Sequence, residues 1–578
     1  MGRSHPRRVR SLFLALLACF GLLIWRLGVI QVAQHDLYAG ARLEQGTAAV
    51  PLESEPRGRI LDRNLGPLAG GVPEECVVII PALMKDADHV VRRLAAVLGR
   101  PVSEVRSQMG KPGALPYSLS PSQRRALAAH QWEGVYVLPV TVRYPTPSLA
   151  AHVLGFTGPV AGRDEIAALS RAGSKSYGLG DRVGKAGLEL AYEQDLKGSR
   201  PARTARVFVD ARGRPLQGLG LVVTEGAPDG RHDLVLTLDR RVQAAVEEVL
   251  DRHGVRGAAA VLDVGNGDLL AVASRPGFDP RAPGKAAKKD GDPFVNRALA
   301  LYQPGSVFKL VVAAAALEEG LVTPESVFRC EGRSEQLIPC WNGAGHGELT
   351  FGRAFAESCN PTFAKVALRL GAERLAAFSR RLGLEDDGII GLPVKHDPRQ
   401  DLSAIARPYN LVNASIGQGP VLLNAVQAAG LAATFANGGT YFRPRLVAEV
   451  RSGGKVLRRL PPDQGRPAVS SGTAAAMCRL MTLVTTEGNG RSAWVPGWGS
   501  AGKTGTAELG DGCTNAWFVG YTPLARPRYA IAVFIEGGVS GGEAAGPVFR
   551  EIADRLLACA PKPGARAGDG LSTQVPLL

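Results

Sequence analysis

Cysteine is scarce in this chain: 578 residues contain only eight, scattered singly and without a CxxC pair. This spacing excludes a small disulfide-stabilised scaffold and argues against a zinc ribbon or knuckle. Acidic residues are also few: the chain has 53 Asp and Glu but 68 Lys and Arg, which gives a net charge of +15. The basic excess favours polyanionic surroundings, such as nucleic acid, an anionic membrane or an anionic wall polymer, without choosing between them.

The remaining composition is that of a folded protein. Hydrophobic residues make up 45% and charged residues 21%, which excludes a wholly disordered chain. The length suggests three or four structural units.

A long apolar run near the N-terminus predicts a membrane anchor. Four arginines lie within the first ten residues, and the apolar stretch follows them. As a helix, residues 11–33 would measure about 34 Å, enough for the ~30 Å hydrocarbon core of a bilayer. The arginines predict that residues 1–10 form a cytoplasmic arm and that everything after residue 34 lies outside.

Two other interpretations of this run fit less well. A cleaved signal peptide needs a small-x-small site after the apolar core, but here the core leads into Arg26 and bulky residues. A lipoprotein site at Leu16–Cys19 would leave too short an apolar core before the cysteine. We therefore expect an uncleaved anchor.

Strand patterns stand at both ends of the C-terminal region, and helical patterns lie between them. The predicted strands are 233–238, 258–264, 268–274, 501–507, 515–521 and 529–536. Gly265-Asn266-Gly267 is a strong hairpin signal between the second and third of them. This order predicts an α+β fold with an antiparallel sheet covered by helices, the last of them over about 543–559. The polar stretch 561–578 predicts a flexible tail.

The strongest local motif is Ser-x-x-Lys at Ser306 and Lys309, which opens an apolar helix ending near Gly320. At the first turn of a helix, free backbone N–H groups favour a developing anion at Ser306. A spacing of three puts the amine within reach of the hydroxyl. Lys309 must be neutral to accept a proton, which burial and a neighbouring cation would favour. Alone, this motif is weak, because many helices contain it by chance.

Two further motifs follow along the chain. Ser358-Cys359-Asn360 lies in a polar break before Pro361, where its hydroxyl and amide can both point into a cleft. Lys503-Thr504-Gly505-Thr506 lies on a predicted strand, where a cation and a hydroxyl could fix a carboxylate and Gly505 lets a ligand backbone come close.

SxxK, SxN and KTG in this order, about 50 and 145 residues apart, form the signature of active-serine penicilloyl enzymes. Over nearly its whole length the chain resembles a class B penicillin-binding protein, a bitopic peptidoglycan DD-transpeptidase. The resemblance extends to five further segments: Arg57–Asn64, Gly187–Glu189, Asn296–Ala298, Gly417–Gly419 and Ala545–Phe549. It implies a pedestal (dimerisation) domain over 35–230 and, over 231–560, a transpeptidase domain with a five-stranded antiparallel sheet covered by helices.

The resemblance also implies catalytic roles. Ser306 would attack the D-Ala-D-Ala carbonyl of a donor stem peptide, with Lys309 as its general base. Ser358 and Asn360 would complete the proton path and bind the peptide. An acceptor amine would then resolve the acyl-enzyme into a crosslink, and β-lactams would stall at the acyl stage.

On the substrate side, Lys503 and Thr504 would hold the terminal carboxylate, next to Gly505. The backbone N–H groups of Ser306 and Thr506 would form the oxyanion hole, where one donor is typically worth ~3 kcal/mol.

Two other motif matches fail on their context. Gly497–Thr504 satisfies the phosphate-loop pattern, but no hydrophobic strand precedes it and glycines follow where a long helix is needed. Gly538–Gly542 fits the nucleophile-elbow pattern, but the last histidine of the chain is His396, so no downstream triad histidine exists.

Two related activities fit the sequence less well. A β-lactamase of the commonest class needs a Glu-x-x-x-Asn spacing that residues 373–392 lack, and a penicillin sensor usually carries several membrane helices. A non-enzymatic scaffold for wall-synthesis proteins is the alternative of a different class, and the complete set of motif side chains argues against it.

The expected partners are stem peptides, β-lactams and, by resemblance, a SEDS-family membrane glycosyltransferase. Nucleic acid is not expected because the basic residues face outward from the cell. We expect no metal and no organic cofactor. A disulfide between Cys330 and Cys340 is left open, and His346 is interpreted as a loop or supporting residue rather than a base.

Overall fold

A computed structural model describes ten segments of the chain: 5–34, 47–110, 112–130, 132–208, 221–226, 229–288, 290–386, 388–394, 399–510 and 512–558. They form two compact units. Unit 1 comprises Met1–Pro56, Gly71–Arg143 and Gly198–Asp229, and unit 2 comprises Arg57–Gly70, Tyr144–Lys197 and Gly230–Leu578. The predicted tail, 561–578, lies outside the described residues.

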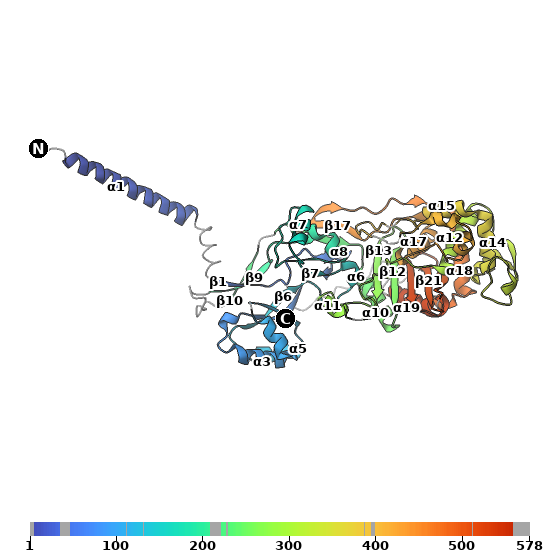
Figure 1. Ribbon diagram of the computed structural model, residues 1–578, viewed down its shortest axis with the longest axis horizontal. Helices are drawn as coiled ribbons and strands as arrows, with labels where there is room; N and C mark the ends of the chain where they lie inside the picture. Colours follow the sequence, from blue (N-terminus) through green and yellow to red (C-terminus); the bar gives the residue numbers. More distant parts are fainter. Residues whose placement is uncertain are drawn as a thin grey trace, which may run out of the picture. The chain divides into compact units, whose positions relative to one another are not determined.

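The N-terminal helix α1 spans His5–Gly28 and continues as a π-helical turn, η1, over Val29–Ala33 (Figure 1). Within it, Val9–Val32 is long and apolar enough to cross a membrane, and none of its most apolar stretch is buried by the protein. The predicted N-terminal apolar helix is therefore confirmed, although it starts at His5 rather than at residue 11. In the described part of the chain, α1 is the one helix that meets these criteria.

Unit 1 contains two three-stranded antiparallel sheets. Their orders are β5-β4-β6, with β4 (Val72–Ile79), β5 (Gly113–Ser118) and β6 (Val135–Val142), and β1-β9-β10, with β1 (Thr47–Pro51), β9 (Arg203–Phe208) and β10 (Leu221–Glu225). Helix α3 (Ala87–Leu98) packs Val90, Val91 and Leu94 into the same cluster as Val77 of β4. Asp86 caps the start of α3 by accepting the N–H of His89, which satisfies one free donor of the first turn.

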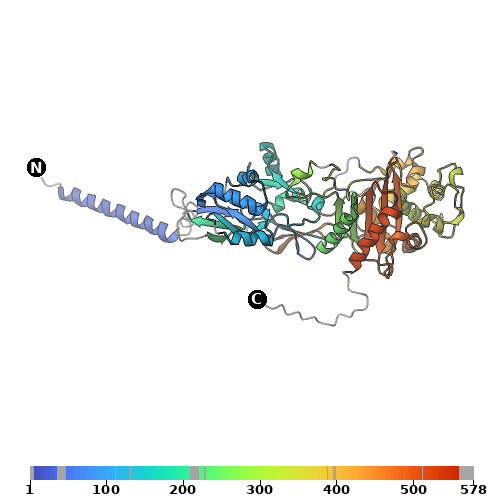
Figure 2. The ribbon, with the colours of Figure 1, turned by 90° about the horizontal axis from the view of Figure 1, so that it is seen from below.

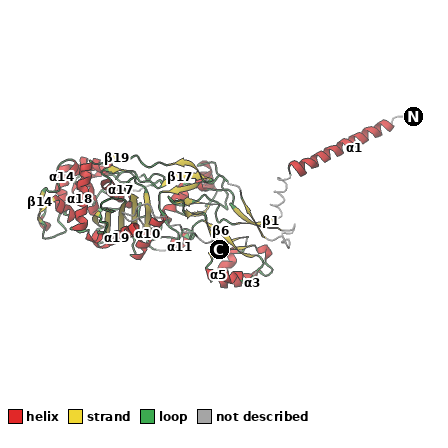
Figure 3. Ribbon diagram, turned by 180° about the vertical axis from the view of Figure 1, so that it is seen from behind, coloured by secondary structure: helices red, strands yellow, loops and turns green. Residues whose placement is uncertain are grey.

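The central sheet of unit 2 has five strands in the order β13-β12-β22-β21-β20, and every pairing is antiparallel. Figure 3 shows its strands in yellow among red helices. Its strands are β12 (Gly257–Asp263), β13 (Leu269–Arg275), β20 (Ala501–Glu508), β21 (Thr514–Thr522) and β22 (Tyr529–Glu536). The predicted sheet is confirmed. Figure 2 shows its last three strands, in red, beside the green β12 and β13.

Helices cover both faces of this sheet, which explains its nearly continuous apolar strands. Ala259 and Val261 of β12 face one cluster, together with helices α10 (Arg240–Arg252) and α19 (Gly546–Ala558). Ala258 and Ala260 face the other cluster, together with α17 (Ala425–Ala436) and α18 (Ser471–Thr486). Successive residues of one strand thus enter opposite cores, as the two-residue period of a strand requires.

The first predicted strand of this region belongs to another sheet. Strand β11 (Asp233–Leu236) lies in the order β18-β17-β11-β2-β3 and pairs in parallel with β2 (Ile60–Leu61). The other members are β3 (Pro67–Ala69), β17 (Val447–Ser452) and β18 (Lys455–Arg459). A segment from early in the sequence thus completes unit 2.

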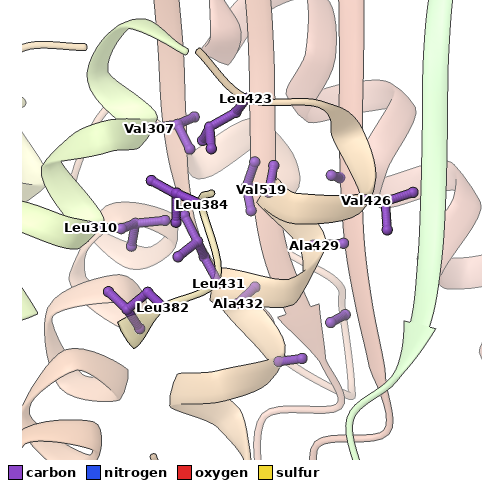
Figure 4. Packing of buried hydrophobic residues seen from close by; sticks show 14 of the residues in the cluster. Val307, Leu310, Leu382, Leu384, Leu423, Val426, Ala429, Leu431, Ala432 and Val519 are labelled. Atoms are coloured by element: carbon purple, nitrogen blue, oxygen red, sulfur yellow. The ribbon is translucent and has the colours of Figure 1, made fainter. Parts of the chain in front are cut away.

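The helix predicted after Ser306 is confirmed as α12, Lys309–Glu318. Its residues Lys309–Ala316 are all buried, so it is a central helix with no solvent face. Figure 4 shows Val307 next to Leu423 and Leu310 next to Leu384, in the cluster that also contains Val519 of β21 and side chains of α17. This packing fixes the start of α12 against the central sheet.

Candidate active site

Ser306 lies in a single 3-10 turn, η3 (Gly305–Phe308), that leads directly into α12. Its side chain is half-buried, whereas Val307 and Phe308 are fully buried. Apolar neighbours therefore hold the turn and leave the serine at its surface. The structure places Ser306 at the helix mouth, as the sequence predicts.

Three glycines let backbone segments approach this turn closely. A Cβ added at Gly305, whose φ is +52°, would lie 2.3 Å from the carbonyl oxygen of Thr506. A Cβ at Gly417 would lie 1.8 Å from the carbonyl oxygen of Gly305, and Gly305 donates its N–H to the Gly417 carbonyl at 3.0 Å. Strand β20 and the turn at Gly417 therefore hold the serine turn between them.

Glycine is required at position 505 for a different reason from the predicted approach of a ligand backbone. A Cβ at Gly505 would lie 2.6 Å from the carbonyl oxygen of Pro304 and 2.8 Å from Val307. The close approach that this glycine permits is thus made by the protein's own serine turn.

The Lys309 amine is fully buried and has three oxygen neighbours. Its Nζ lies 2.6 Å from Asn360 Oδ1, 2.8 Å from the Ser358 carbonyl and 3.2 Å from Ser358 Oγ. The ring of Phe363 lies 5.4 Å away. These contacts bring the SxxK and SxN motifs together.

Burial lowers the pKa of Lys309 to about 7, against a smaller opposing effect of the Cys359 and Cys340 thiols. A neutral amine has two N–H donors and one lone pair. The Ser358 carbonyl and the Asn360 oxygen can only accept, so they take the two donors. The lone pair is then available to a hydroxyl, which is the state a general base requires.

Ser358 sits between two helices, α13 (Phe351–Ala356) and α14 (Asn360–Leu370). Its φ is +57°, a left-handed conformation that costs a non-glycine residue roughly 1–2 kcal/mol. The backbone holds it there: Ser358 donates to the Phe355 carbonyl and Cys359 to the Ala354 carbonyl. Asn360 begins α14 with Pro361 beside it, as the sequence predicts.

Lys503 and Thr504 lie on β20, the edge strand next to the serine turn. The Lys503 amine is fully buried and donates to the carbonyl and hydroxyl oxygens of Thr504, at 3.2 and 3.4 Å. Thr504 in turn donates its hydroxyl to Asn489 Oδ1 at 2.7 Å. Sequence reasoning missed Asn489, because nothing in the loop before β20 indicates which side chain turns toward Thr504.

The charge of one buried lysine acts on the other. Burial and, after it, the charge of Lys309 lower the pKa of Lys503 well below its ordinary value. Two buried amines in one apolar site make it a place where an anion is stabilised, and burial itself favours the neutral form of Lys309. The described residues contain no hydrogen bond from the Ser306 hydroxyl to either amine.

The other motif matches have structural roles. Lys503 and Thr504 stand inside a strand rather than between a strand and a helix, so the phosphate-loop pattern is accidental. Ser540 of the nucleophile-elbow pattern caps the following π-helical turn by accepting the N–H of Glu543.

A group of side chains of the types that can bind a metal ion lies beside the SxN motif, although the sequence was expected to bind no metal. Cys330, Cys340, His346 and Cys359 each place a ligand atom within 4.8 Å of the others. Cys330 and Cys340 are free thiols in this structure. The missed signal was three of only eight cysteines, with a histidine among them, within 30 positions.

The chain matches two known protein domains. Residues 257–554 match the penicillin-binding protein transpeptidase domain, and residues 53–228 match the penicillin-binding protein dimerisation domain. The transpeptidase match contains all three motifs and covers more than half of the chain.

Relatives cover nearly the whole chain. Stage V sporulation protein D of Bacillus subtilis is 29% identical over 94% of this chain and 85% of its own length. Peptidoglycan D,D-transpeptidase MrdA of Salmonella typhimurium is 27% identical over 95% of this chain and 96% of its own.

A chain of the solved structure described as "Structural coordination of polymerization and crosslinking by a peptidoglycan synthase complex" is 27% identical. It superimposes with a TM-score of 0.67 and covers 96% of this chain and 99% of its own. Together with the five-stranded sheet and the joined motifs, these matches show that the chain belongs to the class B penicillin-binding proteins, a family of serine-type transpeptidases.

Proposed function

We propose that this protein crosslinks peptidoglycan stem peptides as a D,D-transpeptidase, through an acyl-enzyme on Ser306. The observation that carries the proposal is the buried amine of Lys309, three residues after Ser306. Ser358 and Asn360 hold this amine through hydrogen bonds. The family to which the chain belongs supports the same chemistry. In that family, β-lactams acylate the same serine.

In the acylation step, Lys309 accepts the hydroxyl proton of Ser306. The serine oxygen bonds to the carbonyl carbon between the two terminal D-alanines, the peptide C–N bond breaks, and the leaving D-alanine amine takes up the proton. Ser358, whose hydroxyl is 3.2 Å from the Lys309 amine, can pass that proton on. The N–H groups of Ser306 and Thr506 stabilise the oxyanion.

In the second step, the amine of an acceptor stem peptide attacks the ester carbonyl. A new amide forms, and the serine hydroxyl is restored. Lys503 and Thr504 bind the carboxylate of the donor in the first step, and a bound carboxylate favours the charged form of Lys503. The edge of β20 offers unpaired backbone groups along which an extended peptide can lie.

Labelling with a fluorescent penicillin tests this assignment. We expect one label per chain in the full-length protein and none after Ser306→Ala. Ser107→Ala, which changes an exposed serine in helix α4 (Val102–Gln108) of unit 1, is the matched control and should label normally. Labelling that persists in Ser306→Ala refutes the nucleophile, and a wild-type chain that never labels favours a non-enzymatic scaffold.

The membrane arrangement is part of the proposal. We infer that α1 crosses the membrane once, with residues 1–10 in the cytoplasm and unit 2 outside, as the basic N-terminus favours. The domain limits 35–230 and 231–560 are proposed with it, supported by the matches to residues 53–228 and 257–554. Alkaline phosphatase, which is active only outside the cytoplasm, should be active when fused after residue 34 and inactive when fused at the N-terminus.

We also propose a SEDS-family glycosyltransferase as membrane partner. The similarity to a chain from a peptidoglycan synthase complex supports it. Co-purification of such an enzyme with the full-length protein, and its loss when residues 1–34 are replaced by an unrelated membrane helix, tests the pairing. Unchanged co-purification after the exchange would locate the contact elsewhere.

A further inference from the structure

The residues directly before Ser306 are attached to the central sheet through Tyr302. The Tyr302 backbone exchanges two hydrogen bonds with Leu423, at 2.9 and 2.8 Å. Its ring packs on that of Phe534 in β22, with the ring centroids 4.1 Å apart. The chain therefore approaches the nucleophile from a residue that is fixed on its backbone and on one face of its ring.

The next residue is attached to the neighbouring strand. Trp517 of β21 is fully buried and donates its indole N–H to the Gln303 carbonyl at 3.1 Å. Its ring centroid lies 4.5 Å from that of Phe534. Because Gly305 then reaches the Thr506 carbonyl of β20, successive residues of this segment contact β22, β21 and β20.

The Tyr302 hydroxyl ends at a carboxylate that is itself held in place. Tyr302 donates to Glu536 Oε1 at 3.1 Å, and Arg297 Nε lies 2.9 Å from the same oxygen. Arg256 donates to Glu536 Oε2 at 2.6 Å. The Arg297 side chain is 2% exposed, so its charge is neutralised inside the protein rather than by water. Glu536 thus offers Tyr302 a charged acceptor with little freedom to move.

The hydroxyl remains a donor at every physiological pH. Burial and, after it, the charge of Glu536 raise the pKa of Tyr302 above its ordinary value. A protonated phenol beside a carboxylate makes a charge-assisted hydrogen bond, which is stronger than one between neutral groups.

We propose that Tyr302 is a positioning residue for the nucleophile, and that Glu536 fixes it through the phenol hydroxyl. The proposal rests on the proposed function, because it concerns the placement of Ser306 for acylation. Tyr302 and Glu536 touch no reacting atom. They act on Ser306 through the four-residue segment that joins Tyr302 to the serine turn.

The placement of Ser306 depends on its backbone. In the described residues, its hydroxyl makes no hydrogen bond to Lys309 or Lys503. Val307 and Phe308 fix the turn after the serine, and the Tyr302 contacts fix the chain before it. A displacement of about 1 Å can slow a reaction roughly 100-fold, so small movements of this segment matter for the attack.

The hydroxyl contact can be separated from the packing of the ring. Tyr302→Phe keeps the ring on Phe534 and the backbone pairing with Leu423, and it leaves Glu536 with both arginines. We therefore expect this variant to fold with an unfolding temperature close to that of the wild type.

Stopped-flow acylation of the full-length protein in detergent, by a fluorescent penicillin at several concentrations, is the first test. It separates the dissociation constant of the noncovalent complex from the rate constant of acylation. For Tyr302→Phe we expect the rate constant to fall roughly tenfold, with less than about a twofold change in the dissociation constant. An unchanged rate constant overturns the proposal.

Tyr117→Phe is the matched control. Tyr117 also donates its hydroxyl to a carboxylate, Glu104 Oε1 at 2.8 Å, but it lies in unit 1. This variant should leave both constants unchanged.

Glu536→Gln separates positioning from stability. It keeps an oxygen that can accept from Tyr302 but removes the negative charge beside buried Arg297. We expect a lower unfolding temperature with an acylation rate constant within about threefold of the wild type, the opposite of the pattern for Tyr302→Phe. Rate constants that instead follow the unfolding temperatures of the two variants show that these residues only stabilise the fold, and refute positioning.

Hydrogen–deuterium exchange reports on the segment without any acylation. Gly305 donates its N–H to the Gly417 carbonyl at 3.0 Å, which protects that amide. Tyr302→Phe should speed exchange in peptides covering residues 303–308 and leave peptides of α10 unchanged, and equal exchange in both proteins overturns the proposal. A wild-type chain that never labels with penicillin refutes the proposed function, whereas exchange still measures the hold of Tyr302 on the segment, so the two failures are distinguishable.

Discussion

Lys309 shows how burial sets the chemistry of a single residue. Its amine is enclosed by the protein and has three oxygen neighbours. Two of these oxygens can only accept hydrogen bonds. With a pKa lowered to about 7, the amine is neutral for much of the time near neutral pH. An exposed lysine three residues after a serine would remain protonated and could not act as a base.

The rate of acylation by penicillin should therefore follow the protonation of Lys309. We expect the rate to be half-maximal near pH 7 and to fall as the pH falls further, because the protonated amine cannot accept the serine proton. Stopped-flow acylation rates across roughly pH 5 to 9 would measure this. Lys309→Arg, whose guanidinium stays charged, should be inactive throughout. A flat profile through pH 7 would rule out Lys309 as the base.

Asn489 should contribute to substrate binding through Thr504. Asn489→Ala removes the acceptor of the Thr504 hydroxyl, and a hydrogen bond of about 1 kcal/mol corresponds to roughly fivefold weaker substrate binding. We expect KM to rise with little change in kcat in a D-alanine release assay. A double-mutant cycle with Thr504→Val is the control, because the two effects should not add. Additive effects would show that the residues act separately.

The motif residues of the site could be predicted from the sequence, but the residues that contact them could not. Ser306, Lys309 and Lys503 are recognisable by spacing. Asn489 is not, because it reaches Thr504 from an irregular loop. Cys359 was visible inside the SxN motif, but its convergence with Cys330 depends on a loop closed by glycines, which no periodic pattern describes.

At the scale of elements, close backbone contacts hold the serine turn in addition to the packing of its buried side chains. Strand β20 and the Gly417 turn approach Gly305 so closely that a methyl group has no room. The turn therefore keeps its position relative to the KTG motif as long as these glycines are present.

Gly305→Ala should harm both stability and acylation. Its φ of +52° costs roughly 1–2 kcal/mol for alanine, and the new Cβ would also collide with the Thr506 carbonyl. We expect a lower unfolding temperature and acylation reduced at least tenfold. Gly320→Ala is the matched control, since its φ is +66° but nothing lies within 4 Å of the new Cβ. It should show the backbone cost alone, and equal losses in both variants would contradict the contact argument.

Prediction at this scale succeeded where patterns are regular. The central strands carry apolar runs or lie beside a Gly-Asn-Gly turn, and the helix after Ser306 has an uninterrupted apolar stretch. The membership of β11 could not be predicted, because its partner β2 has only two residues and lies far away in sequence. A parallel pairing of two residues is too short to produce a recognisable sequence pattern.

At the scale of the whole molecule, the two compact units are interleaved along the chain. Residues 57–70 and 144–197 belong to unit 2, although unit 1 supplies the stretches before, between and after them. Within unit 2, buried Arg57 lies 2.9 Å from Glu189 and 2.8 Å from Glu193. Tyr144 donates its hydroxyl to Glu189 at 3.0 Å. These charges join the separate segments of unit 2.

Arg57→Ala should destabilise unit 2 by about 3–5 kcal/mol, because it leaves two buried carboxylates without their cation. Thermal unfolding followed by loss of penicillin acylation measures this. Lys85→Ala, which removes an exposed ion pair with Glu133, is the control and should change stability by less than about 0.5 kcal/mol. A small effect of Arg57→Ala would mean that water or rearranged neighbours replace the guanidinium.

The pairing of β2 with β11 has a consequence for synthesis. Ile60 leaves the ribosome long before its partner Leu234, and β20–β22 are translated last among the strands that the structure describes. The nascent chain must therefore carry Ile60 and Leu61 without their β11 partner while the residues of unit 1 that follow are translated. A recombinant catalytic fragment that begins at residue 231 would lack that segment altogether, and one that includes residues 57–70 should be markedly more soluble.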